Sequence, residues 1–411
     1  MLKKNTKIPD FLFCAMAAGY VFFTFMHTLT RKIIFEPNFC DFKRYYDAAR
    51  LLGVGNIYQL DIGYHPLFFL IFKLFSFLPQ RYAGIIWCIV MISLVFISIK
   101  LMSSFIDKRF TPHSSLPTIF VLIFITFSYQ PLMEDLVVGQ VNIILMLLFS
   151  LMAFRFQKNN ILSGLCMSIM LLLKLQYGLF LVLFLLRKRY KVIASTIFFY
   201  LLWAGIFSVF IGGEIMGLYF KKLFFFIGPQ DRFALLAGDE FFLPCIFGVL
   251  SRVFYNSNWL SMRVVKIIYI VLSTGLLINT YRYIQIKKVT DELENIYAFI
   301  MTALLMLFIT PFTECHHLTI LLPAFFFLFY DTIEKKGNND KILYLSAFFL
   351  IALKYSLNQF PSFHSGISSL LSMGKFYGLI MLYVLVLRLM KNRQGISGER
   401  IEDNNKTRGV L

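Results

Sequence analysis

Apolar segments of about the length of a membrane-spanning helix recur along the whole chain and are separated by short polar turns. A helix needs ~18 or more apolar residues to cross a bilayer, and several segments reach that length. The predicted spans are residues 10–30, 83–105, 116–132, 141–154, 161–186, 192–211, 262–284, 295–313, 318–330, 342–358 and 375–390. The pattern therefore predicts an all-α integral membrane protein that crosses the bilayer many times.

Segment 161–186 has polar residues at its centre, Lys174 and Gln176. A straight helix would hold Lys174 in hydrocarbon at a cost of about 2.5 to 3.5 kcal/mol. We therefore expect two short helices in a hairpin whose tip faces the outer side, which gives about twelve passes and places both termini inside. Other segments, such as 141–154, are too short for a full crossing, so we expect a polar recess within the bundle.

Two outer segments, 31–82 and 212–261, are too long to be turns. Within the first, 39–52 and 66–80 are predicted as helices that lie on or dip into the outer leaflet, because one mixes apolar and charged positions and the other is apolar but short. In the alternative arrangement 66–80 crosses the membrane, which would place the basic pair Lys108-Arg109 outside.

Lysine and arginine gather in the turns on one side of this arrangement, whereas the predicted outer turns 133–140, 314–317 and 359–374 contain neither. Short basic loops face the cytoplasm in membrane proteins. The net charge of +18 is therefore explained by topology, and we expect no nucleic-acid partner. We expect the chain in the plasma (inner) membrane, as one polytopic domain over 1–390 with a disordered, cytoplasmic polar tail over 391–411.

Composition agrees with this interpretation. Side chains that are 58% hydrophobic and only 15% charged exclude a soluble globular protein. The six cysteines are scattered without CxxC spacing, so neither a zinc site nor a disulfide framework is indicated.

Ionisable and amide side chains gather at the predicted outer ends of the spans. They include Asp41, Asp47, His65, Glu134, Asp135, Gln140, Asn142, Glu314, His316 and His317, with Lys174 and Gln176 at the hairpin tip. Such groups are costly at membrane depth, so their convergence on one face indicates a functional site. Each also has a structural interpretation: Asp41 can pair with nearby basic residues and Lys174 can snorkel. A metal site at the adjacent histidines is disfavoured, because they lack the i, i+4 spacing of a zinc helix.

Five short motifs follow one another along the chain: Asp41-Phe-Lys-Arg-Tyr-Tyr-Asp-Ala-Ala-Arg50, Tyr64-His-Pro-Leu67, Gly139-Gln-Val-Asn142, Gly164 with Lys174, and Glu314-Cys-His-His317. In this order and spacing the chain resembles glycosyltransferase family 87 over roughly residues 10–390. These are membrane-integral enzymes of the GT-C type, similar to the polyprenol-phosphate-mannose-dependent alpha-mannosyltransferases. Members usually have Tyr-Pro-Pro where this chain has Tyr64-His65-Pro66, a departure that affects the local substrate contacts.

The resemblance implies an inverting transfer of a hexose such as mannose from a polyprenyl-phosphate carrier to a hydroxyl of a glycan or glycolipid acceptor on the extracytoplasmic face. It matches Asp41 to the family's catalytic base, and Lys174, His316 and His317 to its membrane-embedded lysine and histidine pair. A base must deprotonate the acceptor hydroxyl, and cations must stabilise the negative charge of the leaving phosphate. The expected phosphate-stabilising residues are Lys174, Arg44, His316 and His317, and the expected substrate-binding residues are Tyr45, Tyr64, His65, Gln140, Asn142, Gln176 and Glu314. We expect no cofactor and no protein-bound metal, with a divalent-cation requirement left open.

The polyprenyl chain of such a donor needs an apolar groove, which we expect between the short helices and the horizontal segments. The alternative hypothesis is a polytopic transporter or lipid-linked sugar flippase, suggested by the many passes and the central Lys174. No internal repeat is evident, however, and the ionisable groups favour one face. A non-catalytic membrane scaffold is a third hypothesis.

Overall fold

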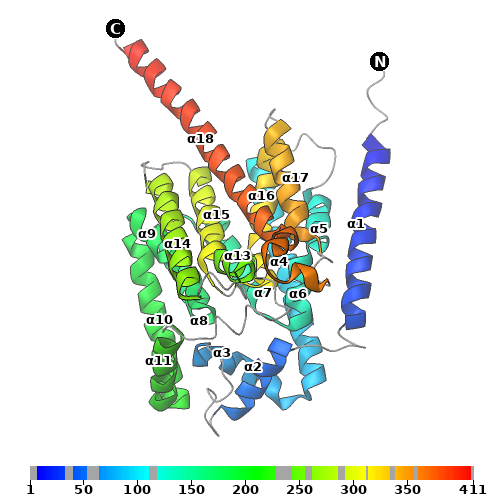
Figure 1. Cartoon of the computed structure of the whole chain (residues 1–411), viewed down its shortest axis with the longest axis vertical. Helices are drawn as coiled ribbons and strands as arrows, with labels where there is room; N and C mark the ends of the chain where they lie inside the picture. Colours follow the sequence, from blue (N-terminus) through cyan, green and yellow to red (C-terminus); the bar gives the residue numbers. More distant parts are fainter. Residues whose placement is uncertain are drawn as a thin grey trace.

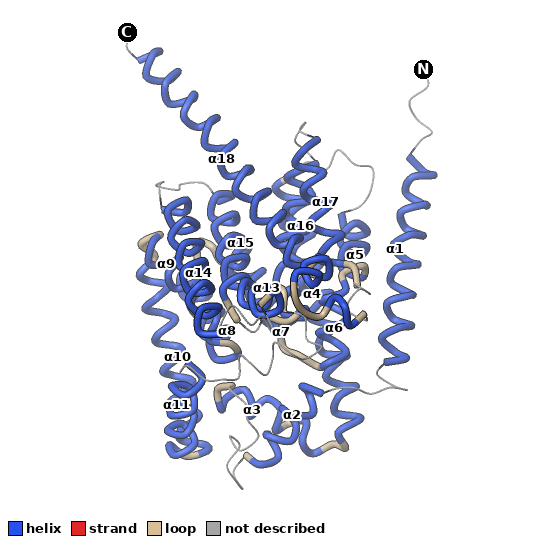
Figure 2. Tube along the Cα trace, viewed as in Figure 1, coloured by secondary structure: helices blue, strands red, loops and turns tan. Residues whose placement is uncertain are grey.

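The computed structural model describes residues 7–32, 40–52, 64–110, 118–227, 243–254, 262–285, 292–311, 313–333, 338–354 and 360–408. Every regular element within these ranges is helical. Figures 1 and 2 show a bundle in which most helices run along one direction and both chain termini lie at the same end. The predicted all-α class is confirmed, and the position of the termini agrees with an even number of passes.

The long helices fall where the hydrophobic pattern predicted spans. They are α1 (Lys7–Thr30), α4 (Gln80–Arg109), α10 (Tyr190–Ile211), α14 (Met262–Gln285), α15 (Glu292–Ile309), α17 (Asn338–Ala352) and α18 (Gly374–Arg408). Within the described part of the chain, four helices are long and apolar enough to cross a membrane, those within α4, α10, α14 and α15, or five if the bent pair Thr118–Phe127 and Gln130–Val138 is one span. The protein is therefore a membrane protein, while the number of about twelve passes stays a prediction.

Short helices occupy the middle of the bundle. They are α5 (Thr118–Phe127), α6 (Gln130–Val138), α7 (Asn142–Ser150), α8 (Asn160–Leu173), α9 (Leu179–Leu186) and α16 (Leu322–Ile333), with a π-helical turn at Leu151–Arg155 and 3-10 helices η5 (Leu175–Gly178) and η6 (Cys315–Leu321). Several of their ends lie inside the protein, since Tyr129 before α6 and Gln140 after it are both buried. Polar helix ends are thus brought into the bundle, as a recess requires.

The predicted straight span 116–132 is wrong in detail. Helix α5 ends at Phe127, and α6 continues at an angle of 61° through most of the segment 133–140 that was predicted to be an outer turn. Pro131 lies in the first turn of α6. A proline is tolerated there but would remove a hydrogen bond inside a continuous helix, which explains the break.

The predicted division of 161–186 into a hairpin is confirmed. Helix α8 ends at Leu173, Lys174 is extended with φ −151° and ψ 116°, and η5 and α9 follow. The two far ends of the hairpin meet, because Arg189 after α9 donates to Asn160 at the start of α8 at 3.0 Å. Lys174 therefore lies at the tip.

Two helices lie across the bundle direction at the end opposite the termini (Figure 1), an orientation that agrees with the prediction for the first outer segment. Their position at the outer leaflet stays a prediction. They are α2 (Cys40–Leu51) and α3 (Pro66–Lys73), followed by the 3-10 turn η3 (Phe75–Phe77). With eight residues, α3 is too short to cross a membrane, so the alternative in which 66–80 spans it is wrong. The Phe72 ring packs 4.6 Å from the Trp87 ring of α4 and fixes the crosswise helices to the bundle.

The second long segment, 212–261, contains α11 (Gly213–Ile227) and α13 (Ile246–Val253). Its positions 228–242 and 255–261, like 33–39 and 53–63 of the first segment, lie outside the described residues. The expectation of a disordered tail is corrected, because α18 continues to Arg408 as one helix that extends from the bundle (Figure 1). A formed helix can be extended without a new nucleation step, so a polar sequence can continue it.

Candidate functional site

Asp41 lies in the first turn of α2, where helix amide groups favour a carboxylate. Its carboxylate accepts a hydrogen bond from Gln140 Nε2 at 2.5 Å and lies 3.6 Å from the exposed guanidinium of Arg44. The Gln140 Oε1 in turn accepts from the Tyr45 hydroxyl at 2.9 Å. The side chain of Asp41 is 16% exposed, so this carboxylate is held in place but still accessible.

The turn that carries Gln140 is built on Gly139. This residue ends α6 with φ +76°, in the left-handed region that favours glycine. A Cβ atom there would come within 2.5 Å of the Phe42 Cβ, and the Gly139 carbonyl oxygen accepts from Trp87 Nε1 at 3.2 Å. The absence of a side chain thus allows α2 to approach closely and brings Asp41 to Gln140.

Behind this turn lies a chain of buried polar groups. Asp135 accepts hydrogen bonds from Asn142 Nδ2 at 2.6 Å and from the Ile143 backbone at 3.2 Å. Asn142 Oδ1 accepts from the Lys174 ammonium at 2.8 Å. The hairpin tip is therefore joined to the ends of α6 and α7.

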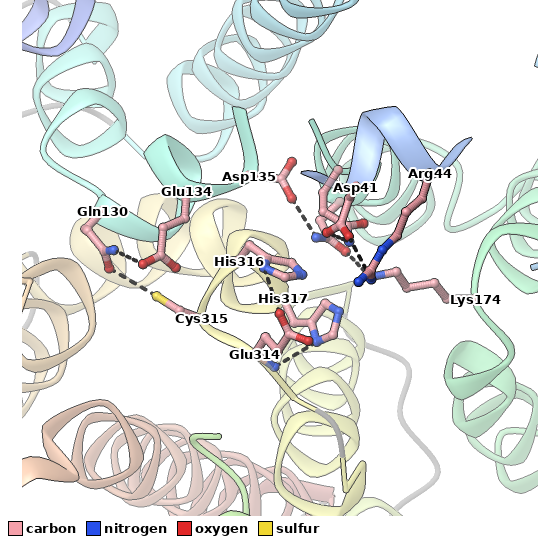
Figure 3. A network of polar contacts seen from close by, with 12 residues as sticks. Asp41, Arg44, Gln130, Glu134, Asp135, Lys174, Glu314, Cys315, His316 and His317 are labelled. Atoms are coloured by element: carbon pink, nitrogen blue, oxygen red, sulfur yellow. Dashed lines mark hydrogen bonds and ion pairs between the residues drawn. The ribbon is translucent and has the colours of Figure 1, made fainter. Parts of the chain in front are cut away.

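The third part of the site is the segment that begins η6. The Glu314 side chain and the His317 ring form a reciprocal capping box, in which His317 Nδ1 accepts from the Glu314 backbone at 3.0 Å. His316 Nδ1 lies 3.5 Å from the Glu314 carboxylate, and the buried His316 Nε2 has no hydrogen-bond partner in the described structure. Figure 3 shows this segment between Asp41 and Lys174 on one side and a second polar cluster on the other.

Protonation in this segment is shifted by burial. The pKa of Glu314 is raised to about 7, first by burial and then by the charge of Asp41. The pKa of His316 is lowered well below its usual value by burial and then by the Lys174 charge. His316 is therefore a neutral ring at neutral pH, so it serves as a hydrogen-bonding group and not as a cation for a phosphate.

The Tyr64 and His65 side chains of the Tyr-His-Pro motif contact different parts of the protein. The Tyr64 hydroxyl lies 3.0 Å from the Tyr45 hydroxyl and so joins the Asp41 network. His65 instead caps α3, with Nδ1 accepting from the Leu67 backbone at 3.2 Å. Its ring packs 4.9 Å from the ring of Tyr219, and burial lowers its pKa to about 4. His65 is a helix cap in this structure, with its ring packed among aromatic side chains.

Gln176 is a further expected substrate-binding residue that the structure does not join to the Asp41 network. It lies in η5, two residues beyond Lys174, and its buried Nε2 has no hydrogen-bond partner among the described residues. No group of three or more His, Cys, Asp or Glu side chains within the described ranges is placed to hold a metal ion.

Sequence reasoning missed a second polar cluster on the other side of η6. Lys375 donates to Gln130 Oε1 at 2.7 Å and to the Ile351 carbonyl at 2.7 Å. Gln130 donates to the Glu134 carboxylate and accepts from Cys315 Sγ at 3.1 Å (Figure 3). The available signal was weak: Lys375 is the first residue of the last predicted span, where a basic residue is usually an interfacial anchor.

An apolar cavity of about 430 Å³ lies between α1, α5, α16 and α17. Phe120, Phe348 and Leu353 are among its lining residues. The short helix α5 lines it, as expected of a lipid groove, but the horizontal helices α2 and α3 do not. The cavity approaches the second cluster at Leu353, whose carbonyl oxygen accepts from Lys375 Nζ at 3.0 Å.

Comparison with protein families matches residues 63–311 to glycosyltransferase family 87. The matched range is more than half of the chain and contains Gln140, Asn142 and Lys174, whereas Asp41 precedes it and Glu314 follows it. No curated protein and no solved structure matches the chain.

Proposed function

Because the chain belongs to glycosyltransferase family 87, we propose that the site around Asp41 transfers one sugar from a polyprenyl-phosphate carrier to an acceptor hydroxyl, with inversion. The family confirms the resemblance and makes the protein a membrane glycosyltransferase. The proposal adds the donor class, a hexose such as mannose, a glycan or glycolipid acceptor, and a reaction on the extracytoplasmic face of the plasma membrane. A transporter or flippase gains no support from membership of a family of transferases.

The observation that carries the proposal is the setting of Asp41. Gln140 and Arg44 hold its two carboxylate oxygens, yet part of the side chain is exposed. A carboxylate has lone pairs to spare for a further donor. Asp41 therefore accepts the proton of the acceptor hydroxyl as the hydroxyl oxygen bonds to the anomeric carbon. The bond from that carbon to the phosphate oxygen breaks, and its electron pair leaves with the phosphate.

The leaving phosphate gains negative charge as this bond breaks, and cations placed beforehand stabilise it. Lys174 and Arg44 are the charged groups near Asp41 that suit this role (Figure 3). The neutral His316 offers its Nε2, which has no partner within the described part of the chain, as a hydrogen-bonding group. Tyr64 and Glu314, both partly exposed, are our candidates for contacts with sugar hydroxyls. Tyr45 is buried and its hydroxyl bonds to Gln140, so it holds the site in place.

The donor's hydrocarbon chain needs an apolar site, and the cavity between α1, α5, α16 and α17 is our candidate. Its end at Leu353 is linked through Lys375 and Gln130 to Cys315 in η6. A chain in this cavity would thus end beside the segment that carries Glu314 and His316.

The test is sugar transfer by the purified protein in lipid vesicles from a panel of polyprenyl-phosphate sugars with long and short chains. We expect Asp41→Asn to reduce transfer by about 10²- to 10⁴-fold, the usual contribution of a general base. Asp47→Asn, in the same helix α2, is the matched control and should retain activity. Equal activity of Asp41→Asn and the wild type would disprove the role of Asp41. Consumption of no donor by the folded wild type would disprove the proposed reaction.

A further inference from the structure

Lys174 is presented by a break in the helical hairpin. Its extended backbone ends α8, so its side chain leaves the helix surface and reaches Asn142, the first residue of α7. Within the described ranges, Asn142 is the hydrogen-bond acceptor of its ammonium group, at 2.8 Å. A lysine has three N–H donors, so two remain for a ligand.

Asn142 is not free to bind a sugar in this arrangement. The residue is 1% exposed, and both ends of its side-chain amide are used within the protein. Nδ2 donates to Asp135, and Oδ1 accepts from Lys174. The positive end of the amide dipole therefore faces the carboxylate and the negative end faces the ammonium, which joins the two charges into one chain.

Asp135 itself is completely buried, and both its side chain and its backbone carbonyl accept hydrogen bonds. The carboxylate accepts from Asn142 and from the Ile143 backbone, and the carbonyl oxygen of Asp135 accepts from the backbone amides of Gly139 and Gln140, each at 3.0 Å. A buried carboxylate without a compensating cation is strongly destabilising. Lys174 is the charged partner to which this network leads.

We propose that Asp135 is a positioning residue that acts through Asn142 to keep Lys174 charged and to aim its ammonium group at the phosphate of the lipid-linked donor. The inference rests on the proposed function, because the phosphate belongs to the donor. It assigns Asn142 the role of connecting Asp135 to Lys174, in place of sugar binding. It also explains why a polar chain is buried behind Gln140, where α6 and α7 meet.

The charge pairing is tested by thermal unfolding of purified Asp135→Asn, Lys174→Met and the double variant. Each single change leaves one buried charge without its partner, so we expect each to lower Tm. In the double variant neither charge remains, so its Tm should be higher than that of either single variant. Losses of Tm that simply add would overturn the pairing.

The positioning role is tested by donor kinetics of the same proteins. In the otherwise wild-type protein, we expect Asp135→Asn to raise the KM for the donor about tenfold. Added to Lys174→Met, the same change should alter the residual transfer by less than about twofold, because Asp135 acts through Lys174. Asp340→Asn is the matched control: Asp340 is also buried and ion-paired, 3.3 Å from Arg388, but it joins α17 to α18. It should lower Tm without changing the donor KM.

The outcomes separate this inference from the proposed function. If Asp135→Asn reduces transfer by the same factor in the wild type and in Lys174→Met, the positioning role is wrong, even if the wild type transfers sugar. If the wild type consumes no donor, the proposed function is wrong. The donor phosphate is then also wrong as the ligand of Lys174, whatever the result of the unfolding experiment.

Discussion

Glu314 is a half-buried carboxyl group whose protonation depends on the fold. Its pKa rises from 4.5 to about 7, first because of burial and then because of Asp41. Between these values the folded protein holds a proton that the unfolded chain has released. The free energy of unfolding therefore falls as pH rises through this window, since the folded state binds more protons.

We expect Glu314→Gln to remove this pH dependence, because a glutamine cannot ionise and can still take part in the capping interaction. On going from about pH 5 to about pH 8, the Tm of the variant should fall less than that of the wild type. Thermal unfolding of both proteins in detergent across this range is the measurement. If Tm depends on pH in the same way in both proteins, the pKa of Glu314 is not raised by the fold.

At the scale of elements, the contact of α2 with the turn between α6 and α7 determines whether Asp41 meets Gln140. We expect Gly139→Ala to destabilise the protein by about 1 to 3 kcal/mol, because the new methyl group overlaps Phe42 and the residue must keep a positive φ. Transfer should also fall, since Asp41 moves away from Gln140. Unfolding and transfer assays measure both effects.

Gly178→Ala is the control for this change. Gly178 has a negative φ, and a methyl group there would meet only Leu171 Cδ2, at an ordinary contact distance of 3.8 Å. It should therefore leave both stability and transfer close to the wild type. If Gly139→Ala behaves in the same way, the close approach of α2 is not required for the site.

At the scale of the whole molecule, the structure separates a basic end from the end that carries the site. At the basic end Arg189 bonds to Asn160, and Gln157 donates to the Glu292 backbone at 3.4 Å. At the other end, Asp41 meets Gln140. The positive-inside rule then predicts that the site faces outward.

Single cysteines at two exposed lysines, Lys43→Cys and Lys158→Cys, test this orientation in a background without the native cysteines. An impermeant maleimide added to intact cells should label Lys43→Cys, and should label Lys158→Cys only after the membrane is permeabilised. The reverse pattern would place the site on the cytoplasmic side and contradict the proposed extracytoplasmic reaction.

Much of the architecture could be predicted because it depends on local composition. Apolar segments located the helices, and the polar centre of 161–186 predicted the break at Lys174. The bend after Phe127 was missed, because both flanking segments are apolar and only Pro131 signals it. The helical tail was missed because its polar composition is typical of disorder. That it continues a helix already formed is not visible in the composition of the tail.

The sequence by itself determined the membrane class, the positions of most helices and the order of motifs that led to the family, since these properties belong to single segments. Only the tertiary structure decided which polar groups meet. Lys174 and Asn142 are 32 positions apart, and Lys375 and Gln130 are 245 apart. Such contacts depend on how helices pack, because the cost of burying each polar group is offset only by partners that packing brings within reach.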